Sequence, residues 1–168
     1  MGSIRLPGLG RFLEDFSVGD IYPHPFARTI LDADNTWFTL LTSNTHQIHV
    51  DAEYASATEF KRPLVVSTLT LAVVTGLSVL DVSQNAVANL GWDHVVLVAP
   101  VFAGDTLHAE SVVLLVRESR TRPGQGIVTV RTVGYNQRNE TVITFERSVL
   151  MPSRALSPEN PSGTQLIQ

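Results

Sequence analysis

The stretch that decides the fold is Val65-Val66-Ser67-Thr68-Leu69-Thr70-Leu71-Ala72-Val73-Val74-Thr75-Gly76-Leu77-Ser78-Val79-Leu80. Its small and apolar residues recur at spacings of three and four, as they do on one face of an α-helix. Ser67 or Thr68 is available as the N-cap, and Gly76 lies near the end of the pattern. We therefore predict a helix with a wide buried face over residues 65–80. A strand is the alternative, because many of these residues are β-branched.

The residues that follow this helix predict an antiparallel sheet. Apolar and polar residues alternate at the start of the run 127–133, which is typical of a strand with one face in water. The stretch 137–140 supplies a tight hairpin turn, and 123–126 supplies a looser one. Apolar and β-branched runs predict four strands, at residues 86–98, 106–117, 126–137 and 140–150.

Residues 35–41, which include Trp37 and Phe38, predict a shorter helix before the central one. The order of elements is then strand, short helices, a long buried helix and antiparallel strands. This order indicates an α+β fold in which a curved sheet wraps one long central helix. We expect Trp37, Phe38, Phe60 and Trp92 to lie in the core or in the wall of a pocket.

Length and composition describe one domain and exclude several functions. The chain has 168 residues, 43% of them hydrophobic, which suits a single core. A formal net charge of −4 with scattered basic residues argues against nucleic acid as a partner, and the absence of cysteine excludes thiol chemistry. No apolar run is long enough for a membrane span and no signal peptide is evident, so we expect a cytoplasmic protein. Residues 1–151 are expected to form the domain, and 152–168, with three prolines, a flexible tail.

Residues 42–55 carry the densest set of chemically active side chains, on what we predict to be a loop. His46 and His49 would share a face if this segment were helical, but spacing fixes no third metal ligand. Acid–base catalysis by one of these two histidines is therefore favoured over metal binding. The other histidines, His24, His94 and His108, are expected to have structural roles.

Several short motifs, taken together, resemble the MaoC-like, (R)-specific enoyl-CoA hydratase family of hot-dog proteins. The resemblance spans roughly residues 11–151, and the motifs are Glu14-Asp15-Phe16, Val18-Gly19-Asp20, Arg62-Pro63-Leu64-Val65 and Gly104-Asp105-Thr106-Leu107. It implies a single hot-dog domain, a sheet wrapped around a helix, that commonly dimerises by joining two sheets. It also implies addition of water to, or its removal from, acyl thioesters of coenzyme A or a carrier protein, with no cofactor and no metal.

The catalytic motif of the family runs Asp, any residue, Asn, Pro, any residue, His. In this chain the histidine matches His49, while Asn44 stands at the aspartate position and His46 at the asparagine position. An amide cannot accept a proton at neutral pH, so Asn44 is expected to position water or substrate while His49 transfers the proton. His46 is a candidate assistant.

The resemblance also implies which groups bind the thioester. Main-chain N–H groups at the start of the central helix, here those of Val66 and Ser67, are expected to polarise its carbonyl. Ser67 can equally be a plain N-cap. Arg120 and Arg122 are the candidates for binding a phosphate of the carrier, because an acidic protein must supply local cations for an anionic ligand.

The sequence leaves three functions open. The first is a hydratase or dehydratase on a short thioester, with the Arg117–Arg122 run resembling a branch that acts on mesaconyl- or itaconyl-type substrates. The second is a non-catalytic hot-dog subunit that binds an acyl thioester and pairs with an active chain, which would explain the missing aspartate. The third is a thioesterase on the same scaffold. We expect a homodimer, or a heterodimer with another hot-dog chain.

Overall fold

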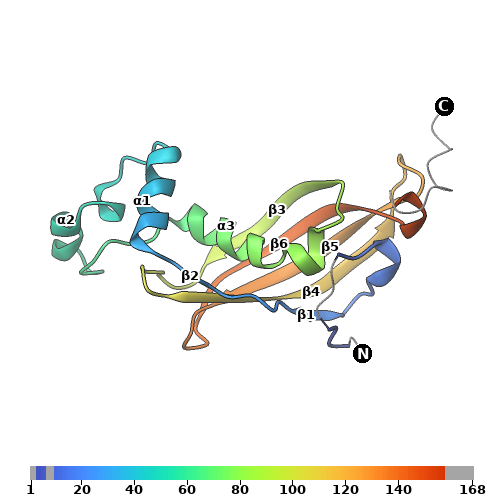
Figure 1. Ribbon diagram of the computed structural model, residues 1–168, viewed down its shortest axis with the longest axis horizontal. Helices are drawn as coiled ribbons and strands as arrows, with labels where there is room; N and C mark the ends of the chain where they lie inside the picture. Colours follow the sequence, from blue (N-terminus) through green and yellow to red (C-terminus); the bar gives the residue numbers. More distant parts are fainter. Residues whose placement is uncertain (1–2, 7–9, 158–168) are drawn as a thin grey trace.

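The computed structural model of the protein describes residues 3–6 and 10–157. An antiparallel sheet curves around one face of the central helix α3 (Ser67–Leu77), while α1 (Asp32–Leu41) and α2 (Ala52–Ala57) project beyond one end of the sheet (Figure 1). Among the described residues, no helix is long and apolar enough to cross a membrane. The predicted α+β class is confirmed.

The four predicted strands form most of the sheet. Bulges interrupt the pairing of β3 with β6, of β4 with β5 and of β5 with β6, and such bulges bend a sheet. In spatial order the strands are β1 (Ile21–Pro23), β4 (Thr106–Glu118), β5 (Gln125–Tyr135), β6 (Thr141–Pro152) and β3 (Ala88–Leu97), and β2 (Arg28–Thr29) pairs with the start of β4.

The central helix is present but shorter than the sequence pattern. It has 11 residues, and a π-helical turn, η3 (Val79–Ser83), follows it. Val66, rather than Ser67 or Thr68, is the N-cap residue, so the predicted cap is wrong and the helix begins without a capping side chain. At Gly134 an added Cβ would lie 2.7 Å from a methyl carbon of Val74, so this glycine allows the helix to lie close to β5.

The segment predicted as a loop over residues 42–55 is largely helical. It contains the 3₁₀ turn η2 (Gln47–His49) and the start of α2. Asp51 caps α2, because its Oδ1 accepts a hydrogen bond from the N–H of Tyr54 at 2.9 Å. The carboxylate that we counted as chemically active therefore has a structural role in this structure.

The aromatic residues divide between core and surface. Phe38 packs against the main core cluster, as predicted. Trp37 and Trp92 are 66% and 42% exposed, so neither lies in the core. Trp37 instead lines a pocket together with Phe38, and Phe60 lines another, as the second part of the prediction allows. Trp92 belongs to β3, which pairs with no strand other than β6 in the part of the chain that the structure describes.

The first residues of the predicted tail, 152–157, belong to the folded domain. Pro152 is the last residue of β6, and a 3₁₀ turn, η4 (Arg154–Leu156), follows. The Arg154 guanidinium binds both oxygens of Asp15 at 2.7 Å, which ties this turn to the N-terminal part of the domain. The rest of the predicted tail, residues 158–168, lies outside the described residues.

Four buried polar side chains are linked in a row by hydrogen bonds. His24 Nδ1 lies 3.0 Å from Asp81 Oδ2, and its Nε2 lies 2.8 Å from Ser111 Oγ, which in turn contacts Thr132. All four residues are buried, so His24 has the structural role that we predicted. His108 lies on β4 and stacks on Tyr135, whereas His94 is exposed at a bulge of β3 and pairs with Glu146.

Arg147 is a second buried polar residue, and it is poorly satisfied. Its Nη2 donates to Ser78 Oγ at 2.9 Å, but Nε and Nη1 have no hydrogen-bond partner among the described residues. Burial lowers the pKa of Arg147 to about 10, which still leaves the guanidinium charged at neutral pH. A buried cation without a carboxylate partner costs folding free energy.

We therefore predict that Arg147→Met raises the free energy of unfolding by about 1–4 kcal/mol, because it replaces a desolvated charge with an apolar chain of similar length. Urea unfolding at neutral pH measures the change. Arg117→Met, at an exposed arginine, is the control and should alter stability by less than about 0.5 kcal/mol. A variant less stable than the wild type would show that the guanidinium stabilises the core.

Candidate active site

The centre of the candidate site is the short segment that leads into α3. Its backbone forms hydrogen bonds with two other segments. Leu64 N–H donates to Ile48 O at 3.0 Å, and Val65 N–H donates to Val101 O at 2.9 Å. The histidine segment, the start of the central helix and the loop before β4 are thus joined at one point. This junction lies at the end of the sheet from which α1 and α2 project (Figure 1).

Of the two histidines in this segment, His49 has the geometry that acid–base catalysis requires. Its Nδ1 lies 2.7 Å from the carbonyl oxygen of Leu64. A carbonyl only accepts, so in the neutral ring Nδ1 carries the proton and Nε2 carries the lone pair. Nε2 has no hydrogen bond among the described residues, and the ring is partly buried. His49 therefore presents a fixed, basic nitrogen.

Asn35 fixes the backbone around His49, and the sequence reasoning missed it. It is 4% exposed, and its Nδ2 donates to His49 O at 2.9 Å and to Leu64 O at 3.2 Å. Its Oδ1 accepts from Val66 N–H at 2.9 Å. One side chain on α1 thus connects the histidine turn to the start of α3. The sequence carried no signal for this role, because Asn35 stands at the start of the predicted helix, where asparagine is common as an N-cap.

Asn44 and His46 have local partners that limit what they can do. Asn44 Oδ1 accepts from His46 N–H at 3.0 Å, which leaves its NH₂ group without a partner among the described residues. His46 Nδ1 accepts from Ile48 N–H at 3.2 Å, so in the neutral ring its proton is on Nε2. The two imidazole rings are 5.8 Å apart in an edge-to-face arrangement. His46 is therefore a cap for η2 and is not available as a second base through Nδ1.

The two amides predicted for the thioester carbonyl have different environments. The Val66 N–H is already bonded to Asn35, so it is not a free donor in this structure. Ser67 is the first residue of α3, and its N–H has neither an intrahelical acceptor nor another partner among the described residues. A free donor at a helix N-terminus is suited to an oxygen that gains negative charge. Of the two predicted donors, the Ser67 N–H is therefore the one available to the thioester oxygen in this structure.

An apolar cavity of about 230 Å³ opens beside this N-terminus. Leu64, whose carbonyl holds His49, forms part of its wall, so the cavity and the histidine share one backbone segment. The cavity is smaller than the roughly 300–1,000 Å³ common for pockets that bind drug-sized ligands. Its lining residues are Phe60, Leu64, Val65, Ser67, Thr70, Leu97, Val98, Ala99, Pro100 and Val101.

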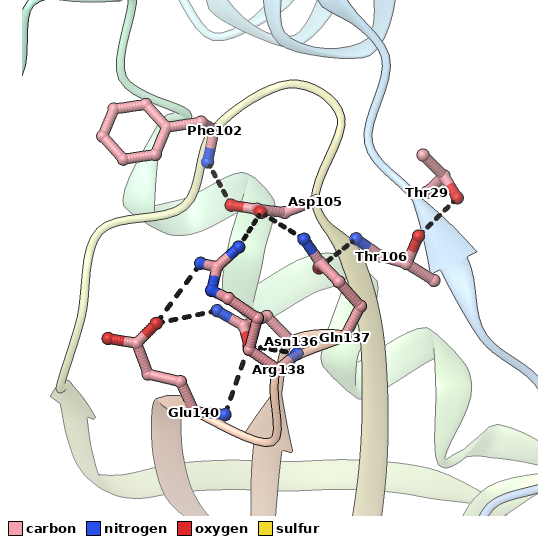
Figure 2. Close-up of polar contacts among 8 residues, drawn as sticks. All are labelled: Thr29, Phe102, Asp105, Thr106, Asn136, Gln137, Arg138 and Glu140. Atoms are coloured by element: carbon pink, nitrogen blue, oxygen red, sulfur yellow. Dashed lines mark hydrogen bonds and ion pairs between the residues drawn. The ribbon is translucent and has the colours of Figure 1, made fainter.

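A polar network holds the loop that forms one wall of this cavity (Figure 2). Asp105 Oδ2 accepts from Phe102 N–H at 3.0 Å, and Oδ1 accepts from Gln137 at 2.9 Å and from Arg138. Burial by itself would raise the pKa of Asp105, but these hydrogen bonds and the charge of Arg138 outweigh it and hold the pKa below its usual value. The Gly104-Asp105 motif is therefore structural, and Gly104 adopts a φ of 95° that favours glycine.

Arg120 and Arg122 lie far from His49 within one chain. Both are exposed in the turn between β4 and β5, whereas the histidine segment lies beyond the opposite end of the sheet (Figure 1). β4 has 13 residues and so spans about 40 Å. The structure does not bring these arginines together with the other predicted site residues. No group of three or more potential metal ligands occurs within the described residues.

The fold and the site define a class that known proteins share. The family model described as the MaoC like domain matches residues 16–136, and the chain belongs to this family. Its fold is the hot-dog fold. A Mycobacterium tuberculosis protein described as a double hot-dog fold superposes with a TM-score of 0.79, at 23% identity, over 89% of this chain and 46% of its own.

Two curated relatives are enzymes. Mesaconyl-CoA hydratase of Cereibacter sphaeroides is 35% identical over 92% of this chain and 45% of its own length. The (R)-specific enoyl-CoA hydratase of Aeromonas caviae is 29% identical over 68% of this chain and 81% of its own length. The chain thus spans about half the length of the mesaconyl-CoA hydratase that it matches.

Proposed function

We propose that this chain is a hydratase/dehydratase for a short enoyl or hydroxyacyl thioester, carried by coenzyme A or a carrier protein. The observation that carries the proposal is His49: the carbonyl of Leu64, a residue that also lines an apolar cavity, fixes its protonated Nδ1, and its basic Nε2 has no hydrogen bond among the described residues. A base, an oxyanion donor and a small apolar space are the parts that water addition to a conjugated thioester requires.

In the hydration direction, His49 Nε2 accepts one proton from water. The water oxygen forms a bond to the β-carbon of the substrate, and the electron pair of the double bond moves toward the thioester carbonyl. The oxygen of the resulting enolate is stabilised by the Ser67 N–H and by the dipole of α3. The imidazolium then returns its proton to the α-carbon, so one residue acts as base and then as acid. Dehydration is the reverse.

Asn44 is proposed to hold the reacting water. Its oxygen is occupied by His46 N–H, so the NH₂ group is the part available to a ligand. Such a donor can bind the water oxygen while the water proton points to His49, and it can stabilise the developing hydroxide. His46 contributes to the site by stabilising the 3₁₀ turn η2.

The cavity size favours a short acyl group, and the names of the relatives favour a methyl-branched one of the mesaconyl kind. The small apolar space would accept a methyl branch. The (R)-specific relative supports an unbranched enoyl-CoA as the alternative substrate.

We propose that a second hot-dog chain covers β3, in a homodimer or a heterodimer. β3 pairs with no strand other than β6 among the described residues. The Mycobacterium tuberculosis protein described as a double hot-dog fold, of which this chain covers 46%, supports a pair of such units. The end of β3 also lines the cavity, so a partner there would complete its wall. Large apolar side chains are exposed along and beside this edge: Leu90, Trp92, Val95, Val96, Leu97 and Val98.

The test is an assay of the purified chain on mesaconyl-CoA and crotonyl-CoA, with light scattering to record its oligomeric state. Loss of the conjugated thioester absorbance without release of free thiol is expected. Thiol release instead would identify a thioesterase. An inert chain that co-purifies with a MaoC-like chain containing the full Asp and His pair would support a non-catalytic subunit, the alternative that Asn44 favours.

A further inference from the structure

Thr70 carries a buried hydroxyl group without a partner. Its side chain lines the apolar cavity, and the residue is only 1% exposed. This hydroxyl forms no hydrogen bond among the described residues. Four other hydroxyl-bearing residues are buried to a similar degree and do form hydrogen bonds: Thr39, Ser78, Ser111 and Thr132. A buried polar group without a partner is rare in folded proteins and needs an explanation.

The first turn of α3 explains why this hydroxyl is unpaired. A threonine inside a helix commonly donates to the carbonyl oxygen four residues earlier, as Thr39 does to Asn35 O at 2.7 Å. For Thr70 that acceptor is Val66 O, which already accepts from the N–H groups of Leu69 at 2.9 Å and of Thr70 itself at 3.2 Å. A carbonyl oxygen has two lone pairs, so no acceptor site remains there for the hydroxyl. The hydroxyl is therefore left to interact with whatever fills the cavity.

Thr70 lies deeper in the cavity than the proposed thioester site. Ser67 and Thr70 are three residues apart, so both lie on one face of α3, and Thr70 is about 4.5 Å further along the helix axis. A four-carbon acyl group whose carbonyl lies at the Ser67 N–H ends near this level, whereas a six-carbon group has to pass it, since each carbon–carbon bond is about 1.5 Å long. Among the described residues that line the cavity, none is charged, and Ser67 has the only other hydroxyl group.

A hydrocarbon chain that reaches this hydroxyl meets an opposing effect. Water satisfies such a group as long as no ligand reaches it, and a hydrocarbon displaces the water without forming a hydrogen bond of its own. The buried hydroxyl then loses its hydrogen bond, which opposes the favourable burial of additional methylene groups. The two effects are of similar size, so one threonine is enough to cancel the usual advantage of a longer acyl chain.

We propose that Thr70 is a specificity-determining residue, whose hydroxyl restricts the cavity to acyl groups of about four carbons by penalising longer hydrocarbon chains. This inference rests on the proposed function, which places the thioester carbonyl at the Ser67 N–H and the acyl group in this cavity. The restriction depends on the polarity of the Thr70 side chain rather than on its volume. Valine and serine separate these two properties, because valine keeps the volume without the hydroxyl and serine keeps the hydroxyl with less volume.

The experiment measures the binding of two saturated thioesters, butyryl-CoA and hexanoyl-CoA, which a hydratase cannot convert. In a wholly apolar cavity the two additional methylene groups of hexanoyl-CoA would tighten binding about tenfold. We expect the wild-type chain to show none of this gain. Thr70→Val should raise the affinity for hexanoyl-CoA relative to that for butyryl-CoA by about 5- to 150-fold, the effect of one unpaired hydroxyl. Thr70→Ser should not raise this ratio.

Thr68→Val is the matched control. Thr68 is exposed on α3 and does not line the cavity, so this variant should keep the wild-type ratio of the two affinities. A wild-type chain that binds hexanoyl-CoA about tenfold more tightly than butyryl-CoA would overturn the proposal, and so would a Thr70→Val variant with the wild-type ratio. A higher ratio in Thr70→Ser than in Thr70→Val would show that side-chain volume sets the limit, which also contradicts the proposal.

Two further arrangements keep the test decisive. If Thr70→Val does not fold, Thr70→Ala replaces it, because alanine also lacks the hydroxyl, and its ratio has to exceed that of Thr70→Ser. Because neither ligand reacts, a chain that shows the predicted ratios but hydrates no enoyl thioester would refute the proposed function alone. An active hydratase whose ratio is the same with valine at this position would refute only the role of Thr70.

Discussion

Replacing His49 by alanine is expected to lower kcat for hydration by about 10²- to 10⁴-fold, with KM changed only a few-fold. The reason is that His49 Nε2 is the proposed proton acceptor, while the cavity that binds the acyl group is formed by other residues. Steady-state kinetics on mesaconyl-CoA and crotonyl-CoA measure both constants.

His108→Ala is the matched control for this prediction. His108 is also a partly buried histidine, but its neighbours Leu107 and Ala109 face the core, so its own side chain lies on the outer face of the sheet. It should keep activity within about threefold of the wild type. A His49→Ala chain that is equally active would remove His49 from the mechanism.

Asn35→Ala is expected to have the second largest effect, on stability and on activity together. The change leaves the carbonyl of His49 and the N–H of Val66 without this partner, while the carbonyl of Leu64 keeps only its contact with His49 Nδ1. Each unpaired buried group costs about 1–3 kcal/mol, so a total loss of about 2–5 kcal/mol in the free energy of unfolding is expected after partial relaxation. Because His49 then loses its fixed position, kcat should fall at least about tenfold in the fraction that is folded.

Gln84→Ala removes an amide side chain that is exposed, and serves as the control for Asn35. It should change stability by less than about 0.5 kcal/mol. Thermal and urea unfolding, followed by kinetics well below the melting temperature, separate the two effects of Asn35→Ala. A chain that melts like the wild type and retains its kcat would show that the Asn35 hydrogen bonds do not hold the site together.

The long strands could be predicted from the sequence because their signal is local. Burial alternates along β5 and along much of β6, mostly as the apolar residues do, although Thr132 and Arg147 are buried polar exceptions. The hairpin turn after β5 carries its own turn residues.

The helix pattern located α3 but gave only part of its buried face: Leu69 and Leu77 are buried, whereas Ala72 and Gly76 are exposed and Val74 is buried instead. Its start was misplaced because Val66, a residue with no capping side chain, is held from a distance by Asn35.

The candidate site was predictable only in part, because much of it depends on contacts between distant segments. His49 was found through its motif. The occupied Val66 amide, the role of Asn35 and the distance of Arg120 and Arg122 from the site all depend on tertiary packing, and no spacing in the sequence encodes them.

The hydratase and the binding-subunit hypotheses predict opposite effects of changing Asn44. The most direct test therefore compares the activity of the isolated wild-type chain with that of Asn44→Ala and Asn44→Asp on mesaconyl-CoA and crotonyl-CoA. If the chain is a hydratase that uses His49 as its single base, the wild type is active alone. Asn44→Ala then lowers kcat by about 5- to 150-fold, the effect of one lost positioning hydrogen bond. A wild type that hydrates neither thioester, together with an Asn44→Asp variant that does, would contradict this account and identify the chain as a binding subunit.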